Sequence, residues 1–207
     1  FESGKKVEGM ARVNVLFRQQ NGGVGAATKD GIVMANKLGA SEIIKIDADD
    51  QMDPDLIPML IDPIRKGKAD FSKGTRFDSP EDLEGMPLTR LIGNSGLTLF
   101  NKFSSGYWSV NDPTNGFIAF SGKLAQGLAW EKIANDYFFE SDLLFRARLW
   151  GARVTQIRMR SRYGDESSGL KPYRVFFPFL YKILRNQLKR YIYMYFVREW
   201  NQGTIYL

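Results

Sequence analysis

The sequence predicts an α/β fold in which a mainly parallel sheet is flanked by helices. Short segments rich in Val, Ile and Phe alternate with longer segments of helical composition, which is typical of such sheets. One apolar segment, Ile43–Ile46, ends abruptly at Asp47, as a buried strand does at the carboxyl edge of a sheet. The 207 residues, 43% of them hydrophobic, suit one domain, or one domain with an appendage, around a real core.

The expected elements can be placed one by one. The expected strands are Val13–Phe17, Glu42–Ile46, Ala69–Lys73, Thr114–Phe120 and Arg153–Arg160. The expected helices are Gly25–Leu38, Asp55–Arg65, Arg90–Phe103 and Phe138–Trp150. Gly39 ends the first helix, and Asp53 followed by Pro54 caps and begins the second. Pro58 and Pro63 predict breaks in that second helix.

The composition excludes several classes of catalytic site. The chain has no cysteine, so it has no disulfide, no zinc-thiolate site and no thiol nucleophile. It also has no histidine, which removes the commonest general base. Acid–base chemistry must therefore come from carboxylates, lysine or tyrosine. The first residues, Phe1–Gly4, resemble neither a natural start nor a signal peptide, which predicts a truncated chain.

Two aspartates directly follow the second expected strand. Asp47 and Asp49 are two residues apart, so their carboxylates point the same way in an extended backbone. Such oxygen ligands suit Mg²⁺ or Mn²⁺, which would hold a diphosphate, and Gln51 is a third candidate ligand. Open α/β sheets bind ligands at this edge. The alternative is a solvated acidic turn that leads into the helix capped by Asp53.

Arginines follow other expected strands. Arg76 suits a diphosphate or a lipid phosphate through paired hydrogen bonds, and Arg90 is a second candidate of this kind. The alternative for Arg76 is a salt bridge to the acidic segment Asp78–Met86, which is predicted to be a loop.

Three further arginines, Arg158, Arg160 and Arg162, alternate along the end of the last expected strand and share one face. They repel one another unless an anion joins them, and a pyrophosphate together with an acceptor phosphate would serve. Ser167, in the loop that follows, is a further candidate for binding such a phosphate. The alternative is a solvated basic edge strand that resists aggregation.

Six short segments occur in the order and with the residue types of one enzyme family. They are Asn21–Ala27, Asp47–Gln51, Lys73–Phe77, Asp112–Phe117, Phe139–Asp142 and Tyr163–Ser168. On these segments the chain resembles the family 2 glycosyltransferases, and within them the polyprenyl-phosphate sugar transferases of the dolichol-phosphate-mannose-synthase type. A single Asp-x-Asp is a weak signal, whereas the ordered set is specific.

The resemblance implies the GT-A fold for a catalytic domain at residues 1–170. The family has two strands before the position of Val13, which carry the nucleotide-base pocket. Only a dozen residues precede Val13, so we expect these N-terminal strands to be missing from this chain. Residues 171–207 are expected to form membrane-interface helices, and in many relatives such helices lead into transmembrane helices.

The glycine-rich segment Asn21–Gly25 matches neither phosphate-binding fingerprint. No Lys-Ser/Thr pair follows the glycines, and Thr28 stands where the dinucleotide fingerprint has a small apolar residue. A tight turn that lets a helix pack closely on the sheet explains these glycines. The resemblance places the helix beside the donor pocket, which makes Gly23 a candidate for backbone contact with the nucleotide.

The resemblance also gives roles to polar residues later in the chain. Asp112 and Asn115 belong to what is only a turn by composition, and the family places this turn beside the transferred sugar. Glu140 and Asp142 suit a helix start by charge alone, but family members that glycosylate a hydroxyl use a carboxylate here as base. A phosphate acceptor, with a second pKa of ~6, is already anionic and needs no base. Glu140 would then orient an arginine or the metal–phosphate cluster.

The C-terminal segment Tyr173–Trp200 is basic, aromatic and amphipathic. One helical face carries Leu180, Leu184, Leu188, Tyr191 and Tyr195, and the opposite face carries Lys182, Arg185 and Lys189. Residues 151–207 hold 11 basic and 3 acidic side chains, and the rest of the chain is nearly neutral. This pattern predicts a helix at an anionic membrane surface. The alternative is a helix packed on the domain.

Together these features predict an inverting, metal-dependent hexosyltransferase at the cytoplasmic membrane face. It would move a hexose from a nucleotide-diphosphate sugar to a polyprenyl phosphate. The expected catalytic residues are Asp49, Arg76, Glu140 and Asp142, and Asp47 is expected to bind the donor as well as the metal. One alternative is a transferase that glycosylates a hydroxyl in cell-envelope polysaccharide synthesis. The other is a non-catalytic membrane scaffold. No nucleic acid partner is expected, and the oligomeric state stays open, a homo-oligomer included.

Overall fold

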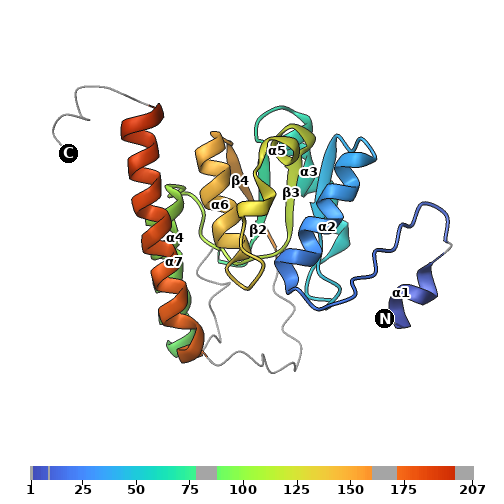
Figure 1. Cartoon of the computed structure of the whole chain (residues 1–207), viewed down its shortest axis with the longest axis horizontal. Coiled ribbons are helices and arrows are strands. Elements are labelled where there is room, and N and C mark those ends of the chain that lie inside the picture. The colour runs from blue at the N-terminus through green and yellow to red at the C-terminus, as the bar shows by residue number, and fades with distance from the viewer. Residues whose placement is uncertain (1, 9, 78–87, 160–171, 199–207) are drawn as a thin grey trace.

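A four-stranded sheet with the order β1-β3-β2-β4 forms the centre of the molecule (Figure 1). The computed structural model describes residues 2–8, 10–77, 88–159 and 172–198. The strands are β1 (Glu42–Lys45), β2 (Phe71–Thr75), β3 (Ile118–Ser121) and β4 (Val154–Arg158). β1 and β2 both pair antiparallel with β3, whereas β2 and β4 are parallel. The sheet is therefore mixed, and β3 runs against the common direction of the other three strands.

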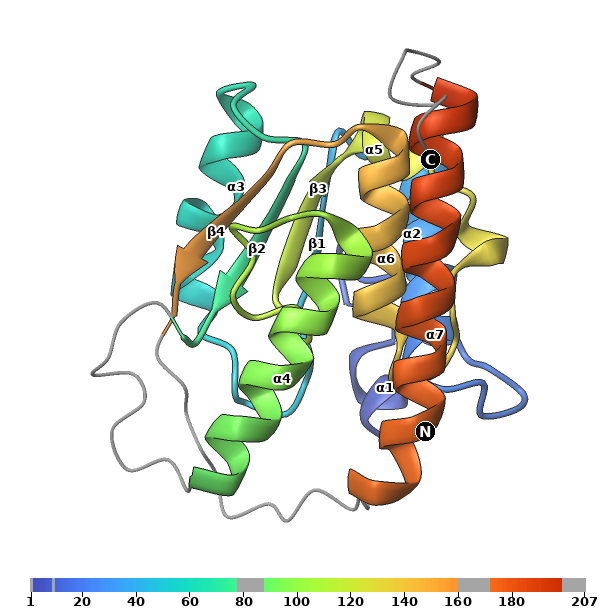
Figure 2. The ribbon, with the colours of Figure 1, turned by 90° about the vertical axis from the view of Figure 1, so that its left-hand side faces the viewer.

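Helices flank this sheet, which confirms the α/β fold. They are α1 (Glu2–Val7), α2 (Val24–Lys37), α3 (Ile57–Arg65), α4 (Leu88–Ser105), α5 (Gly122–Gly127), α6 (Phe139–Trp150) and α7 (Pro172–Ile192). Short 3₁₀ turns lie at Pro54–Leu56 and Trp130–Lys132, and a π-helical turn at Tyr193–Arg198 continues α7. Figure 2 shows α3 on one side of the sheet and α6 on the other, with α7 running beside α6.

The core lies on both faces of the sheet because successive strand residues point to opposite sides. Ile43, Phe71 and Phe120 face the larger cluster, to which α2, α5 and α6 contribute. Phe117 and Ala119 face a smaller cluster formed with α3. Leu143 and Leu144 bring α6 into the larger cluster at 1% exposure each. Burial on this scale, at roughly 25 cal/mol per Å², supplies most of the driving force for folding.

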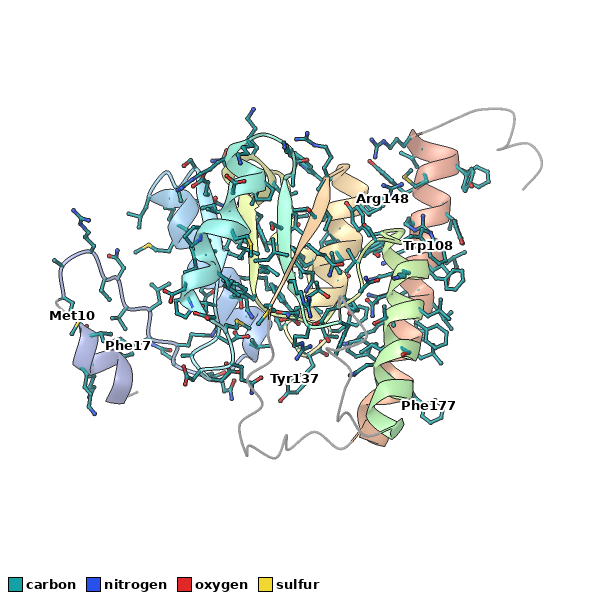
Figure 3. The ribbon with its side chains drawn as sticks, turned by 180° about the vertical axis from the view of Figure 1, so that it is seen from behind. Met10, Phe17, Trp108, Tyr137, Arg148 and Phe177 are labelled. Carbon is teal, nitrogen blue, oxygen red and sulfur yellow. The ribbon has the colours of Figure 1, made fainter. Side chains whose placement is uncertain are left out.

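The prediction of a strand at Val13–Phe17 is wrong. The segment is irregular, and Val13, Leu16 and Phe17 are 42%, 48% and 42% exposed. Figure 3 shows Met10 and Phe17 on a stretch of chain that runs outside the sheet. Within the described part of the chain, no strand pairs with this segment, and a β-propensity without a partner strand does not form a ladder.

The other predicted elements differ mainly at their ends. Asp53 caps as expected, since Asp55 N donates to its Oδ1 at 3.0 Å. Pro58 lies in the first turn of α3, where its missing N–H costs nothing. The break expected at Pro63 does not occur there, because α3 continues to Arg65 before it ends. The predicted loop Asp78–Met86 lies outside the described residues.

The two longest described helices, α4 and α7, lie side by side. Both extend past the edge at which β2 and β4 end (Figures 1 and 2). The helix predicted within Tyr173–Trp200 is therefore present, and it packs on the domain through α4 and α6. Among the described helices, none combines the length and apolar character needed to cross a membrane.

Candidate active site

Charged side chains gather where β1 and β2 end and where β3 begins. Because β3 runs against β1 and β2, the turn before it reaches the same edge of the sheet. Three cations and three carboxylates contribute to this cluster, and all six are at least partly buried. They are Lys45, Lys73, Arg76, Asp47, Asp112 and Glu140.

Lys45 links two of the carboxylates. Its Nζ donates to both oxygens of Asp47, at 2.8 and 2.9 Å, and lies 3.7 Å from Oε1 of Glu140. A third bond, of 3.3 Å, goes to the carbonyl oxygen of Gly116. A Cβ at Gly116 would lie 2.5 Å from Asp47 Oδ2 and from Lys45 Nζ, so only glycine leaves room for this contact. The end of β1 is thus joined through one ammonium group to the start of α6.

Glu140 faces Lys45 from the first turn of α6. Burial raises the pKa of this carboxyl group above its ordinary value, and the charge of Lys45 partly offsets the effect. Its side chain is 11% exposed. The carboxylate therefore belongs to the cluster at the sheet edge.

Asp142, the second acid of that segment, is engaged elsewhere. Its Oδ2 accepts a bond of 2.9 Å from Ala134 N, and its Oδ1 accepts one of 2.8 Å from Nδ2 of Asn186 on α7. The residue is 2% exposed. These contacts favour a structural role for Asp142 over the catalytic role expected from the sequence, because neither oxygen is left to face a substrate.

Arg76 forms a two-bond ion pair with Asp112. Its Nε and Nη2 donate to Oδ2 and Oδ1 at 2.7 and 3.0 Å, and its backbone N donates to Oδ2 at 3.1 Å. Asp112 has a side chain with 0% exposure. Burial favours protonation of this carboxyl, but the hydrogen bonds and charge of Arg76 outweigh it and hold the pKa of Asp112 below its ordinary value.

This pair does not test two of the expectations from the sequence, which stay predictions. Asp112 was expected to recognise a sugar hydroxyl, and Arg76 a phosphate or the segment Asp78–Met86. Breaking a buried pair leaves an uncompensated charge and costs about 3–5 kcal/mol, so we assign the pair mainly to holding β2 against the turn before β3.

Asn115 and Lys73 are the most deeply buried neighbours of Asp112 in the cluster. Asn115 is 3% exposed, and its Oδ1 accepts from Phe117 N at 2.9 Å while its Nδ2 donates to Asp112 at 3.3 Å. Lys73, at 0% exposure, donates to the carbonyl oxygen of Asn115. Burial lowers the pKa of Lys73 to about 8, although Asp112 and Glu140 oppose this shift. The amide of Asn115 is thus internally bonded, which does not favour the sugar contact expected of it.

Asp49 and Gln51 lie on the exposed loop that follows Asp47. Gln51 N donates to Asp49 Oδ1 at 3.2 Å, and the intervening Asp50 has a φ of 58°. This local bond turns the chain sharply and leaves the outer Asp49 oxygen towards solvent. Among the described residues, no group of three or more acidic side chains is placed to hold a metal ion.

The donor set nevertheless suits Mg²⁺ or Mn²⁺. These ions are commonly held by one or two carboxylates, with the remaining positions filled by water and substrate phosphates. Asp47 and Asp49 supply two carboxylates, and the side chain of Asp47 is 34% exposed although it is bonded to Lys45. The residues present therefore fit a metal that a diphosphate helps to bind.

The glycine turn packs on the segment before α6 and not on the sheet. Gly25 N donates to the carbonyl oxygen of Asn135 at 3.0 Å. A Cβ on Gly23, whose φ is 84°, would lie 2.6 Å from that same oxygen. The turn thus needs glycine for close approach, as expected, but its neighbour is a loop. An open hollow of about 410 Å³ lies beside it, lined by residues 15–23 and Ala27.

Only part of the predicted arginine face lies within the described residues. Arg158 ends β4 and is exposed. Arg160, Arg162 and Ser167 lie outside the described residues, and the side chain of Arg90, in the first turn of α4, does as well. Their expected contacts with phosphate stay predictions.

Sequence reasoning missed Lys45 and Lys73 as members of the cluster. Lys73 is the charged residue of the fully buried strand β2, and Lys45 ends the partly buried strand β1, which begins at Glu42. A lysine is rarely buried unless a carboxylate pairs with it. Lys45 also shares a strand face with Asp47, two residues on, so the pairing could have been inferred from that spacing.

Comparison with known proteins identifies the family of this chain. The model of glycosyl transferase family 2 matches residues 3–128, and the chain belongs to this family. A UDP-N-acetylglucosamine–dolichyl-phosphate N-acetylglucosaminyltransferase of Methanococcus voltae is 32% identical over 75% of this chain and 62% of its own length. The polyprenol monophosphomannose synthase of Mycolicibacterium smegmatis is 26% identical over 70% of this chain and 55% of its own. The chain thus spans little more than half the length of these relatives.

A solved structure shares the fold. Glucosyl-3-phosphoglycerate synthase of Mycobacterium tuberculosis, in complex with Mn²⁺, UDP and phosphoglyceric acid, superposes with a TM-score of 0.56. The similarity covers 85% of this chain and 55% of that one, at 20% sequence identity. A likeness at this identity establishes the GT-A architecture of the chain and no more.

Proposed function

We propose that this family 2 glycosyltransferase transfers a hexose from a nucleotide-diphosphate sugar to a polyprenyl phosphate, with inversion at the anomeric carbon. The observation that carries the proposal is the pairing of Lys45 with both Asp47 and Glu140 at the sheet edge. The relatives that act on dolichyl or polyprenol phosphates support the acceptor class.

The donor diphosphate is held by the loop after β1. Asp47 and Asp49, with Gln51 beside them, would hold a divalent metal, which neutralises the charge on the departing nucleoside diphosphate. Gly23 lets the backbone of the glycine turn approach the nucleotide, and the hollow lined by residues 15–23 is the candidate place for the nucleoside.

Transfer needs positioning more than acid–base chemistry. An acceptor phosphate oxygen forms the new bond to the anomeric carbon, while the bond to the donor diphosphate breaks and its electron pair leaves with that group. Because the acceptor is anionic at neutral pH, no side chain has to remove a proton. The exposed Arg158 and its neighbours along the chain would align the acceptor phosphate, and alignment can account for several powers of ten in rate.

The contacts of Glu140 favour a phosphate acceptor over a hydroxyl. A general base must be free to reach the proton it abstracts, whereas Glu140 is largely buried and faces Lys45. We assign Glu140 to orienting Lys45 and, through it, Asp47. A transferase that glycosylates a hydroxyl is the second candidate, and it requires Glu140 to act as base.

Membrane association follows from the outer face of α7. Phe177, Tyr181 and Leu188 are 73%, 67% and 60% exposed, and Leu184 and Tyr191 continue the same stripe. Figure 3 shows Phe177 pointing away from the body of the protein. Arg185 and Lys189 border the stripe and are exposed, and residues 172–198 contain no acidic side chain. Such a face suits an anionic bilayer surface, and we place the protein at the cytoplasmic membrane face.

Lys182 departs from the predicted pattern of this helix. It was expected on the face opposite the apolar stripe, with Arg185 and Lys189, but its Nζ donates to Asp136 of the domain at 2.5 Å. The reason is its place on the helix, four residues before the buried Asn186 and so on the inner face.

Asp49→Asn is expected to abolish transfer and to leave the fold intact, because the change removes a ligand charge on an exposed loop and no core volume. The measurement is transfer of labelled sugar to a short polyprenyl phosphate with Mg²⁺ or Mn²⁺, with a chelator as control. Asp62→Asn, an exposed acid on α3, should keep full activity. Wild-type rates in Asp49→Asn or in chelator would exclude the metal role.

Glu140→Gln is expected to slow transfer by less than the roughly 10²–10⁴-fold lost with an obligate base. The dependence of kcat on pH should still follow the acceptor phosphate, since no carboxyl proton enters the step. Assays on a polyprenyl phosphate and on a glycan hydroxyl decide between the candidates. An inactive variant, together with a wild-type enzyme that prefers the hydroxyl, would establish the second candidate.

Reversing the two exposed charges on α7, Arg185→Glu with Lys189→Glu, is expected to weaken binding to acidic vesicles at least about tenfold, since each basic residue contributes about 1 kcal/mol at an anionic surface. Vesicle flotation with and without anionic lipid measures this. The matched control is Lys37→Glu with Lys68→Glu. It changes the net charge by the same amount, at exposed residues that lie far from α7 in the sequence. If wild-type protein ignores acidic vesicles, or both pairs behave alike, the membrane placement is wrong.

A further inference from the structure

The inner face of α7 carries three polar side chains beside the buried Ile183, whereas its outer face carries an exposed apolar stripe. Lys182, Asn186 and Arg190 are spaced four residues apart and therefore lie on one side of the helix. Lys182 bonds to Asp136, and Asn186 donates to Asp142 at 2.8 Å. Arg190 donates to the last carbonyl groups of α4, at 2.9 and 3.0 Å. A helix that only needed to pack would bury its apolar stripe instead.

Two of these three contacts reach the same short segment, residues 134–142. It carries Glu140, and it also receives the glycine turn through the bond from Gly25 N to Asn135 O. Its Phe138 ring packs edge-on against Phe179 of α7, with centroids 4.8 Å apart. The segment is thus held by α7 on one side and borders the donor side of the site on the other.

Asp142 is the centre of this attachment. One oxygen binds Ala134 N, at the start of the segment, and the other binds the amide of Asn186. Asn186 is 0% exposed, and burying an amide is costly unless it is bonded. Leucine at this place would avoid the cost but would leave the buried carboxylate short of a donor. The Nδ2 group of this amide is therefore matched to Asp142, whereas its Oδ1 accepts no hydrogen bond from the described residues.

We propose that Asn186 is a positioning residue for sugar transfer, acting through Asp142 on the first turn of α6 and hence on Glu140. Glu140 lies two residues before Asp142 in the first turn of α6, so the bond to Asp142 holds the same turn from which Glu140 comes within 3.7 Å of Lys45. The proposal rests on the function proposed above. It makes α7 part of the active-site framework, in addition to its role at the membrane surface.

The charged groups that face Asp142 are few in the described part of the chain. Arg146, one turn further along α6, lies 3.8 Å from Oδ2. Lys29 of α2 also feels the Asp142 charge and donates to Ile133 O at 2.7 Å. From α7 the contact is the neutral Asn186 amide, so a carboxylate placed there would meet Asp142 directly.

Asn186→Asp supplies the test. Two carboxylates at hydrogen-bond distance repel at neutral pH but share a proton when the pH falls. We expect kcat at pH 7.5 to fall about 10–100-fold, as for a misplacement of about 1 Å, and the ratio of variant to wild-type kcat to recover towards about pH 5. The assay uses the full protein with a short, soluble polyprenyl phosphate, so that membrane binding does not contribute.

Two further variants separate positioning from simple folding. In Asp142→Asn with Asn186→Asp, the amide and the carboxylate exchange places, and kcat should return to within about threefold of wild type. Gln187→Glu adds the same charge to α7 one residue on and should leave kcat and its pH profile unchanged. Melting temperatures from circular dichroism confirm that each assay uses folded protein.

The outcomes distinguish a failure of the positioning role from a failure of the proposed sugar transfer on which it rests. If wild-type protein transfers no sugar to any polyprenyl phosphate, the proposed function fails. If wild type is active and folded Asn186→Asp keeps its kcat and pH profile, only the positioning role fails. Should Asn186→Asp not fold, the exchange variant decides alone, and a folded exchange variant with kcat more than about tenfold below wild type overturns the proposal.

Discussion

The ion pairs of the Lys45 ammonium group are the constraint on which the candidate site depends. This one group reaches both oxygens of Asp47 at the end of β1 and comes within 3.7 Å of Glu140 at the start of α6. A lysine with 9% side-chain exposure is costly to bury, and the nearby carboxylates, together with the carbonyl oxygen of Gly116, offset that cost. The need to pair this charge therefore brings together two elements that are nearly 100 residues apart in the sequence, and the glycine at 116 leaves the space for it.

The same rule organises the rest of the sheet edge. Arg76 pairs with the fully buried Asp112, and Lys73 bonds to the backbone beside it. Because these contacts are made within the protein, its own side chains order the edge, and little reorganisation is left for the transfer step. The exposed part of the site is then the loop that carries Asp49, where a metal and a diphosphate have room to bind. A rigid interior with a solvent-facing carboxylate loop is what a donor diphosphate requires.

The sequence predicted the fold class, most of the elements and the acids at the end of β1, because local patterns determine these features. It could not pair Arg76 with Asp112, since the two lie 36 residues apart and only the antiparallel placement of β3 brings them together. The catalytic role expected of Asp142 came from the family resemblance, and the local sequence does not show that its carboxylate bonds to Ala134 N and to the buried Asn186. The strand expected at Val13–Phe17 failed for a similar reason, since a propensity for strand needs a neighbouring strand to pair with.

The most direct test of this account is the titration of the Glu140 carboxyl group, followed by carbon-13 NMR, in wild-type protein and in Lys45→Met. Burial raises the pKa of Glu140 and the charge of Lys45 counteracts this effect, so removal of the ammonium group should raise the midpoint further. Lys68→Met, which removes an exposed lysine, should leave the midpoint where it is. An unchanged Glu140 titration in folded Lys45→Met would contradict the claim that Lys45 joins the two carboxylates.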